Sequence, residues 1–136
     1  MNNYTLAFLD RIVYPNSYDI TLSVFISADG QEFFPVDVKL DTGSVFCVFQ
    51  RRNAALLNLD LEAGTPQRIR TATGSFLAYA HEITLSIEGM EWQATVLFAD
   101  DEYFPVNVVG RVGFLDRLRI GLVDYEQTLF LSAYDD

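Results

Sequence analysis

Lysine, cysteine and histidine each occur only once in the 136 residues, as Lys39, Cys47 and His81. One cysteine excludes a disulfide scaffold and a cysteine-based zinc site. No cluster of His, Asp and Glu has metal-ligand spacing, so we expect neither a metal nor a cofactor. Cys47 lies among apolar neighbours and His81 in mid-strand, which is typical of packing residues rather than of a nucleophile and its base.

Positive charge is also scarce, since nine Lys and Arg stand against 19 Asp and Glu, a formal net charge of −10. With so few cations to displace counterions, binding to nucleic-acid phosphates is not expected. No apolar run approaches the ~20 residues that span a bilayer. The first six residues lack the basic and apolar regions of a signal peptide. We therefore expect a cytoplasmic protein without a nucleic-acid or membrane partner.

The chain is half hydrophobic and has the length of one domain, which we take as residues 1–136. Alternating apolar residues over 18–26 predict a strand, and Asp29-Gly30 predicts a hairpin that returns over 32–40. Residues 1–17 show no clear pattern. Further strands are expected over 44–50, 67–73, 75–87, 91–99, 119–124 and 128–132, with short helices over 52–59 (capped by Asn53) and 113–118. This is an all-β domain, best explained as a small closed barrel with one or two short helices.

The most informative segment is Asp41-Thr42-Gly43-Ser44, which follows one apolar strand and precedes another. A carboxylate near a core is costly unless it is hydrogen-bonded. Two hydroxyls and a glycine that turns tightly, exposing backbone N–H groups, can provide those bonds. The motif is therefore either a cradle for a functional carboxylate or a plain turn between two strands.

A second segment, Asn107-Val108-Val109-Gly110-Arg111, places two apolar residues before a glycine late in the chain, which indicates a close backbone approach. With both segments in this order, residues 18–132 resemble the retropepsin-like aspartic proteases, the retroviral proteases and their single-domain relatives. The resemblance implies a small closed barrel of the retropepsin type. It also implies an aspartic endopeptidase that hydrolyses peptide or protein substrates.

The resemblance assigns roles to individual residues. Because the chain has one Asp-Thr-Gly, the resemblance implies a homodimer, in which each copy contributes one Asp41 and the two residues lie across a two-fold axis from each other. Thr42 matches a threonine that reaches the backbone of the second copy, and Gly43 matches a glycine beside which substrate backbone passes. Thr73 and Gly74 match the tip of a flap that closes over substrate. Val108 and Phe46 are expected to flank apolar side chains of the substrate.

Three further expectations concern Ser44, Arg111 and the last strand. A Ser44 hydroxyl that donates to the Asp41 carboxylate would favour its ionised form and an acidic activity profile. Arg111 matches an arginine that pairs, in retroviral members, with an acidic residue shortly after the Asp-Thr-Gly. Val45-Phe46-Cys47 carries no carboxylate, so Arg111 must find another partner or lie exposed. Residues 128–132 could form the strand that pairs with a second copy.

Two alternatives remain open from the sequence. The first is a catalytically silent retropepsin-fold module for dimerisation or peptide binding. The second is an unrelated small β-barrel that binds an apolar ligand and needs no dimer. An Asp41→Asn variant separates an enzyme from a binding module, because only the enzyme depends on the carboxylate for turnover.

Overall fold

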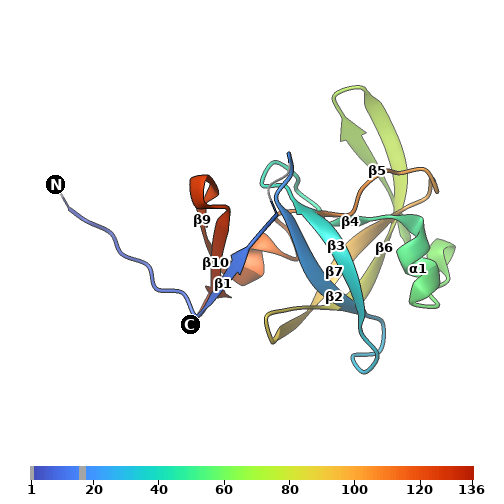
Figure 1. Cartoon of the computed structure of the whole chain (residues 1–136). Coiled ribbons are helices and arrows are strands. Elements are labelled where there is room, and N and C mark those ends of the chain that lie inside the picture. Colours follow the sequence, from blue (N-terminus) through green and yellow to red (C-terminus); the bar gives the residue numbers. More distant parts are fainter. Residues whose placement is uncertain (1, 16–17) are drawn as a thin grey trace.

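A computed structural model describes residues 2–15 and 18–136, and the predicted all-β fold is confirmed (Figure 1). Within these residues no helix is long and apolar enough to cross a membrane. The elements are β1 (Asp10–Val13), β2 (Thr21–Ser27), β3 (Phe34–Leu40), β4 (Val48–Phe49), α1 (Arg51–Leu56), η1 (Leu61–Ala63), β5 (Thr65–Thr71), β6 (Gly74–Ile87), β7 (Met90–Ala99), β8 (Val108–Val109), η2 (Leu115–Arg117), β9 (Leu118–Val123), η3 (Asp124–Glu126) and β10 (Thr128–Ala133).

The main sheet closes into a barrel. Its seven strands follow the order β2-β3-β8-β4-β7-β6-β5, and β2 also pairs with β6, which joins the two sides. Alternate side chains of these strands point inward, because successive residues of a strand face opposite sides. Phe49, Phe98 and Phe114 are the largest of the fully buried side chains. The outer part of the β5–β6 hairpin lies beyond this closure and extends away from the body in Figure 1.

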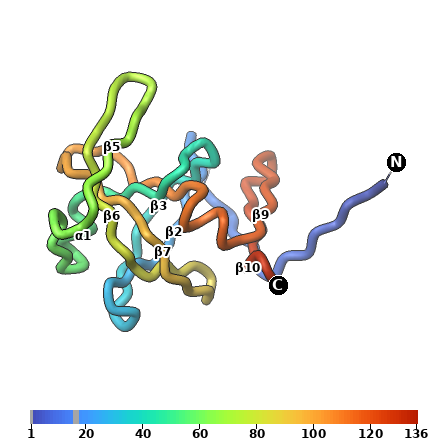
Figure 2. The backbone as a smooth tube through the Cα atoms, turned by 180° about the vertical axis from the view of Figure 1, so that it is seen from behind, coloured from blue at the N-terminus to red at the C-terminus, as the bar shows by residue number. Residues whose placement is uncertain are grey.

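A second sheet of three strands, in the order β1-β10-β9, lies beside the barrel (Figure 2). Leu129 and Leu131 of β10 are fully buried and join the barrel core. Because β10 is the middle strand, both of its edges are already paired within the chain. It therefore offers no free edge to a second copy, contrary to our expectation for residues 128–132.

Two local predictions need correction. Residues 1–17 have no strand pattern, yet Asp10–Val13 form β1 because β10 supplies its partner; residues 1, 16 and 17 lie outside the described part of the chain. Helix α1 starts after Gln50 without a side-chain cap, and Asn53 lies inside it. The Asn53 side chain instead donates to Asn107 Oδ1 at 2.8 Å, a contact that ties the helix to the segment before β8.

Candidate active site

The Asp41 loop connects β3 to β4 at the surface of the barrel. The Asp41 N–H donates to the Val109 carbonyl at 3.0 Å, which fixes the start of the loop on β8. The Gly43 N–H donates to Asp41 Oδ1 at 2.9 Å, and the Ser44 N–H to the Asp41 carbonyl at 3.1 Å. Asp41 is half-buried, whereas Thr42 and Gly43 are exposed. The loop thus orients a carboxylate that solvent or a ligand can reach.

Gly110 packs directly beneath this loop. A Cβ atom at Gly110 would lie 2.4 Å from the Ser44 carbonyl oxygen and 2.5 Å from that of Phe46, so no larger residue fits without moving backbone. The next residues complete the support, because Arg111 N–H donates to the Ser44 carbonyl at 2.9 Å and Val112 N–H to the Val45 carbonyl at 2.8 Å. The predicted close approach at this glycine is therefore confirmed.

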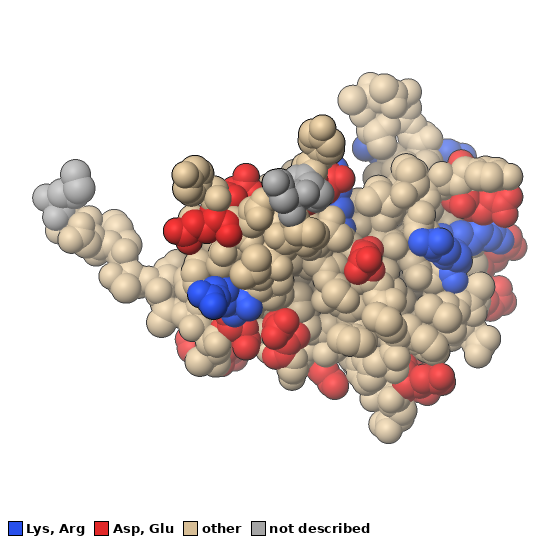
Figure 3. Space-filling view, in the orientation of Figure 1, with Lys and Arg blue, Asp and Glu red and all other residues tan. Residues whose placement is uncertain are grey.

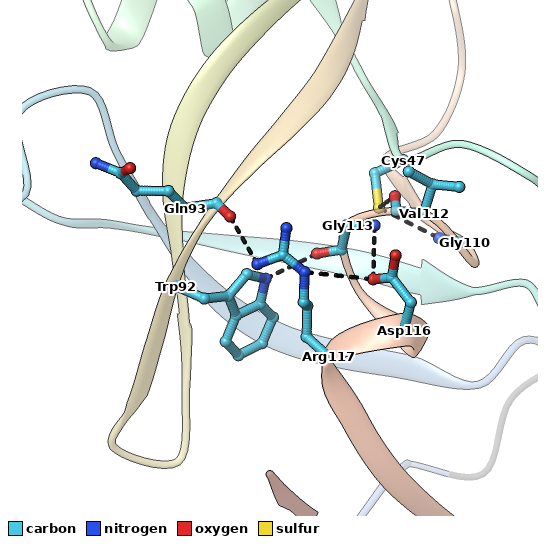
Figure 4. A network of polar contacts seen from close by, with 8 residues as sticks. All are labelled: Cys47, Trp92, Gln93, Gly110, Val112, Gly113, Asp116 and Arg117. Atoms are coloured by element: carbon cyan, nitrogen blue, oxygen red, sulfur yellow. Dashed lines mark hydrogen bonds and ion pairs between the residues drawn. The ribbon is translucent and has the colours of Figure 1, made fainter. Parts of the chain in front are cut away.

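The thiol of Cys47 connects the same two segments (Figure 4). Its Sγ accepts from the Gly110 N–H and donates to the Val112 carbonyl, both at 3.4 Å. Burial raises the pKa of Cys47 to about 11, so the thiol stays neutral near pH 7. A neutral thiol whose donor and acceptor are both used is a packing and positioning group, not a nucleophile.

The β5–β6 hairpin carries the two residues that the resemblance matches to the tip of a flap. Thr73 lies in its turn and Gly74 begins β6, and both are exposed. Nearer the barrel, the Phe76 and Phe104 ring centroids lie 4.9 Å apart. With Phe46 and Ile69, these rings pack against a small buried cluster of Val48, Ala78, Leu97 and Ala99. An apolar surface therefore connects the hairpin with the strand that follows the Asp41 loop.

Comparison with known proteins decides the family. The model of a family described as aspartyl protease matches residues 26–115, which include the Asp41 loop, the hairpin and Gly110. The chain belongs to the aspartyl protease family. The unrelated β-barrel that the sequence left open is thereby excluded. No curated protein matches the chain.

Two solved structures show that this aspartyl protease domain has the retropepsin fold. The first is a retropepsin-like aspartic protease from Rickettsia conorii, with a TM-score of 0.66 and 16% identity over 91% of this chain and 99% of that chain. The second is the EIAV protease in complex with the inhibitor HBY-793, with a TM-score of 0.57 and 23% identity over 74% of this chain and 88% of that chain.

Ser44 does not behave as predicted for this aspartyl protease domain. Its Oγ donates to the Phe46 carbonyl at 2.7 Å and not to the Asp41 carboxylate. The Gly43 N–H donates to the Asp41 carboxylate instead. The expectation that the Ser44 hydroxyl stabilises ionised Asp41 is therefore wrong, because the loop turns that hydroxyl toward the carbonyl of Phe46, two residues further along the chain.

Val108 and Arg111 lie on either side of Gly110 in different surroundings. Val108 is 9% exposed and pairs with Lys39 and Val48 inside the sheet, so it offers little surface to a substrate. The accessible apolar surface comes instead from the rings of Phe76 and Phe104, which the sequence did not indicate. Arg111 is exposed and lines an open cavity of about 540 Å³ beside the Asp41 loop. The cavity's other lining residues are Thr42, Val45, Val112, Leu115 and Asp116.

Proposed function

We propose that this member of the aspartyl protease family is an aspartic endopeptidase that works as a homodimer, with residues 1–136 acting as a single catalytic domain. The observation that carries the proposal is the Asp41 loop itself. It holds a single accessible carboxylate by a backbone N–H and leaves Thr42 and Gly43 exposed at the surface. A two-fold axis beside such a loop brings each carboxylate next to its own copy.

The chemistry follows from two carboxylates that lie close together. They cannot both ionise easily, so the pair holds one proton between them. The ionised Asp41 removes a proton from a bound water, while the protonated Asp41 of the second copy donates to the oxygen of the scissile carbonyl. The water oxygen bonds to the carbonyl carbon and forms a tetrahedral diol. The C–N bond then breaks as a proton passes from the dyad to the leaving amine.

The surroundings of the loop supply the remaining roles. Thr42 is exposed beside Asp41 and available to bond the loop of the second copy, and Gly43 leaves room for an extended substrate backbone. Ser44 braces the loop through the Phe46 carbonyl. Thr73 and Gly74 form the tip of a hairpin that closes over substrate and excludes water. Phe46, Phe76 and Phe104 favour apolar side chains at the scissile bond, and Val108 supports this surface from within the sheet.

The test compares wild type with Asp41→Asn on a diverse peptide library across a range of pH. The asparagine side chain has nearly the same shape but cannot accept or deliver the proton, so we expect the cleavage rate to fall by about 10³-fold or more. Asp101→Asn is the matched control, since that exposed carboxylate lies outside the loop. Equal cleavage by both variants would contradict the proposal. Binding of peptides without cleavage by wild type would identify a silent peptide-binding module instead.

A further inference from the structure

The loop of residues 100–107 connects β7 to β8 and contains neither a strand nor a helix. Its Phe104 ring packs against Phe76 at the base of the hairpin. Within the described part of the chain, only one hydrogen bond reaches residues 101–106 from outside the loop. It is donated by Gln50 Nε2 to the Phe104 carbonyl at 3.0 Å. The Phe104 backbone is therefore held in place by a single side chain.

The orientation of the Gln50 amide follows from its partners. The Gln50 N–H donates to Asn107 Oδ1 at 2.8 Å, so the amide nitrogen of Asn107 lies on the other side and donates to Gln50 Oε1 at 3.4 Å. Nε2 of Gln50 is left to face the Phe104 carbonyl, which can only accept. Asn107 is 8% exposed, so this network is largely enclosed by the fold.

Gln50 immediately precedes α1, yet its side chain makes no capping hydrogen bond to the helix. The next residue, Arg51, also contacts the loop, because its Nη1 donates to the Asp100 carbonyl at 2.8 Å and to Asp100 Oδ1 at 3.0 Å. Two consecutive side chains at the start of α1 thus hold the loop. Arg51 fixes its beginning, and Gln50 fixes it at Phe104.

We propose that Gln50 is a positioning residue for substrate selection. By holding the Phe104 carbonyl, it keeps the Phe104 ring against Phe76 and so determines the preference for large apolar side chains next to the scissile bond. The inference rests on the proposed protease function, in which these rings contact the substrate. Gln50 acts through Phe104 and touches no reacting atom.

The hairpin side of this surface is free of negative charge, in contrast to the chain as a whole. Residues 63–81 contain no Asp or Glu, although the net charge of the chain is −10. In Figure 3 the outer part of the hairpin is tan, whereas acidic side chains are spread over the rest of that face. On the hairpin side, selection among side chains therefore depends on the fit against Phe76 and Phe104 rather than on acidic groups.

The experiment compares paired peptides that differ only by Leu or Ala at one position next to the scissile bond. Gln50→Met removes the donor to Phe104 without adding a charge, and Asn107 Nδ2 keeps its bond to the Asp37 carbonyl at 3.3 Å. We expect the Leu-over-Ala preference in kcat/KM to fall by about threefold to tenfold, through a higher KM for the Leu peptide at unchanged kcat. Gln93→Met, which alters an exposed side chain of β7, should keep the preference.

The Phe104→Ala background tests whether Gln50 acts through the ring. There, Gln50→Met should change the preference no further, because the group that it positions is gone. An equal change in both backgrounds, an unchanged preference in Gln50→Met, or no Leu preference in wild type would contradict the inference.

Two further measurements separate this role from stability and from catalysis. If urea unfolding shows a less stable Gln50→Met protein whose rates on both peptides fall alike, Gln50 has only a structural role and the inference fails. Binding of the same peptides is followed by fluorescence anisotropy in an Asp41→Asn background. If no peptide is cleaved but a Leu preference that depends on Gln50 persists in binding, the positioning role stands and the protease proposal fails.

Discussion

The Asp41 loop and the tip of the β5–β6 hairpin are two surface turns of similar size that are supported in opposite ways. The Asp41 loop is tied to β8 and the turn after it by backbone hydrogen bonds from Asp41, Arg111 and Val112, and Gly110 fills the space beneath it. The hairpin tip is supported by its own strand pairing, and a Cβ atom at Gly74 would meet nothing within 4 Å. One turn is embedded in the fold, and the other stands free of it.

This difference matches what the proposed peptide hydrolysis would require of each part. A carboxylate that must meet its copy at a fixed distance needs a rigid loop, because small displacements of reacting groups reduce rates steeply. A flap must open to admit a polypeptide and close to exclude water, which demands low local stability. The same domain provides both by burying one turn against a second strand and leaving the other exposed.

The largest expected effect comes from adding one methyl group to each turn. Gly110→Ala places a Cβ against two backbone carbonyls, so we expect about 3 kcal/mol of lost stability and a displaced Asp41 loop. Gly74→Ala meets no atom, and only its φ of +157° makes it costly, by about 1 kcal/mol. Urea unfolding of both variants measures the contrast. Similar losses at the two sites would show that the loops are equally supported.

A second effect follows from the buried thiol of Cys47. Burial raises its pKa from 9.0 to about 11, so the folded chain keeps a proton that the unfolded chain releases. The contribution of the protonated Cys47 thiol to the free energy of unfolding is complete below pH 9.0 and is lost as the pH rises toward 11. We expect about 2 kcal/mol less stability at pH 10.5 than at pH 8 in wild type.

Cys47→Ser supplies the control, because a serine keeps the donor and acceptor but does not titrate in this range. Its stability should fall less over the same interval. Tyr14, whose pKa is raised to about 12 by burial and by its hydrogen bond to Asp124, affects both proteins alike above pH 10. Parallel pH dependence of wild type and Cys47→Ser would mean that the thiol is accessible and the loop less tightly packed.

The smallest expected difference between the two turns can be measured in the wild-type protein, without any substitution. In native-state hydrogen exchange, amides at the hairpin tip (residues 71–75) should exchange through local opening, well before global unfolding. The Asp41, Arg111 and Val112 amides should exchange much more slowly, since each donates to a carbonyl of the opposing segment. Equal protection at the two turns would remove the basis for calling the hairpin a movable flap.

Local patterns in the sequence predicted much of the fold and the position of the motif. Alternation and Asp29-Gly30 located β2 and β3, and Asp41-Thr42-Gly43 marked the turn between β3 and β4, because these signals lie within a few neighbouring residues. The missed features depend on distant partners. β1 exists because β10 pairs with it, and Asn53 bonds Asn107 instead of capping its helix.

The same reason explains the errors within the site. The direction of the Ser44 hydroxyl depends on how Gly110 and its neighbours shape the loop. The spacing of residues within the motif does not predict this direction. Phe76 and Phe104 meet across the base of the hairpin although they are far apart in the sequence. Among the described residues Arg111 is exposed and has no ion-pair partner, which is one of the two outcomes that the sequence left open, because Val45-Phe46-Cys47 contains no carboxylate.

The central claim is that the active unit consists of two copies, each contributing Asp41. The most direct measurement is peptide hydrolysis during dilution of the wild-type enzyme, with sedimentation at the same concentrations. We predict that the rate falls as the square of protein concentration once dimers dissociate, and that added Asp41→Asn protein inhibits by forming mixed dimers. A rate that stays proportional to concentration while the protein sediments as a monomer would contradict the account.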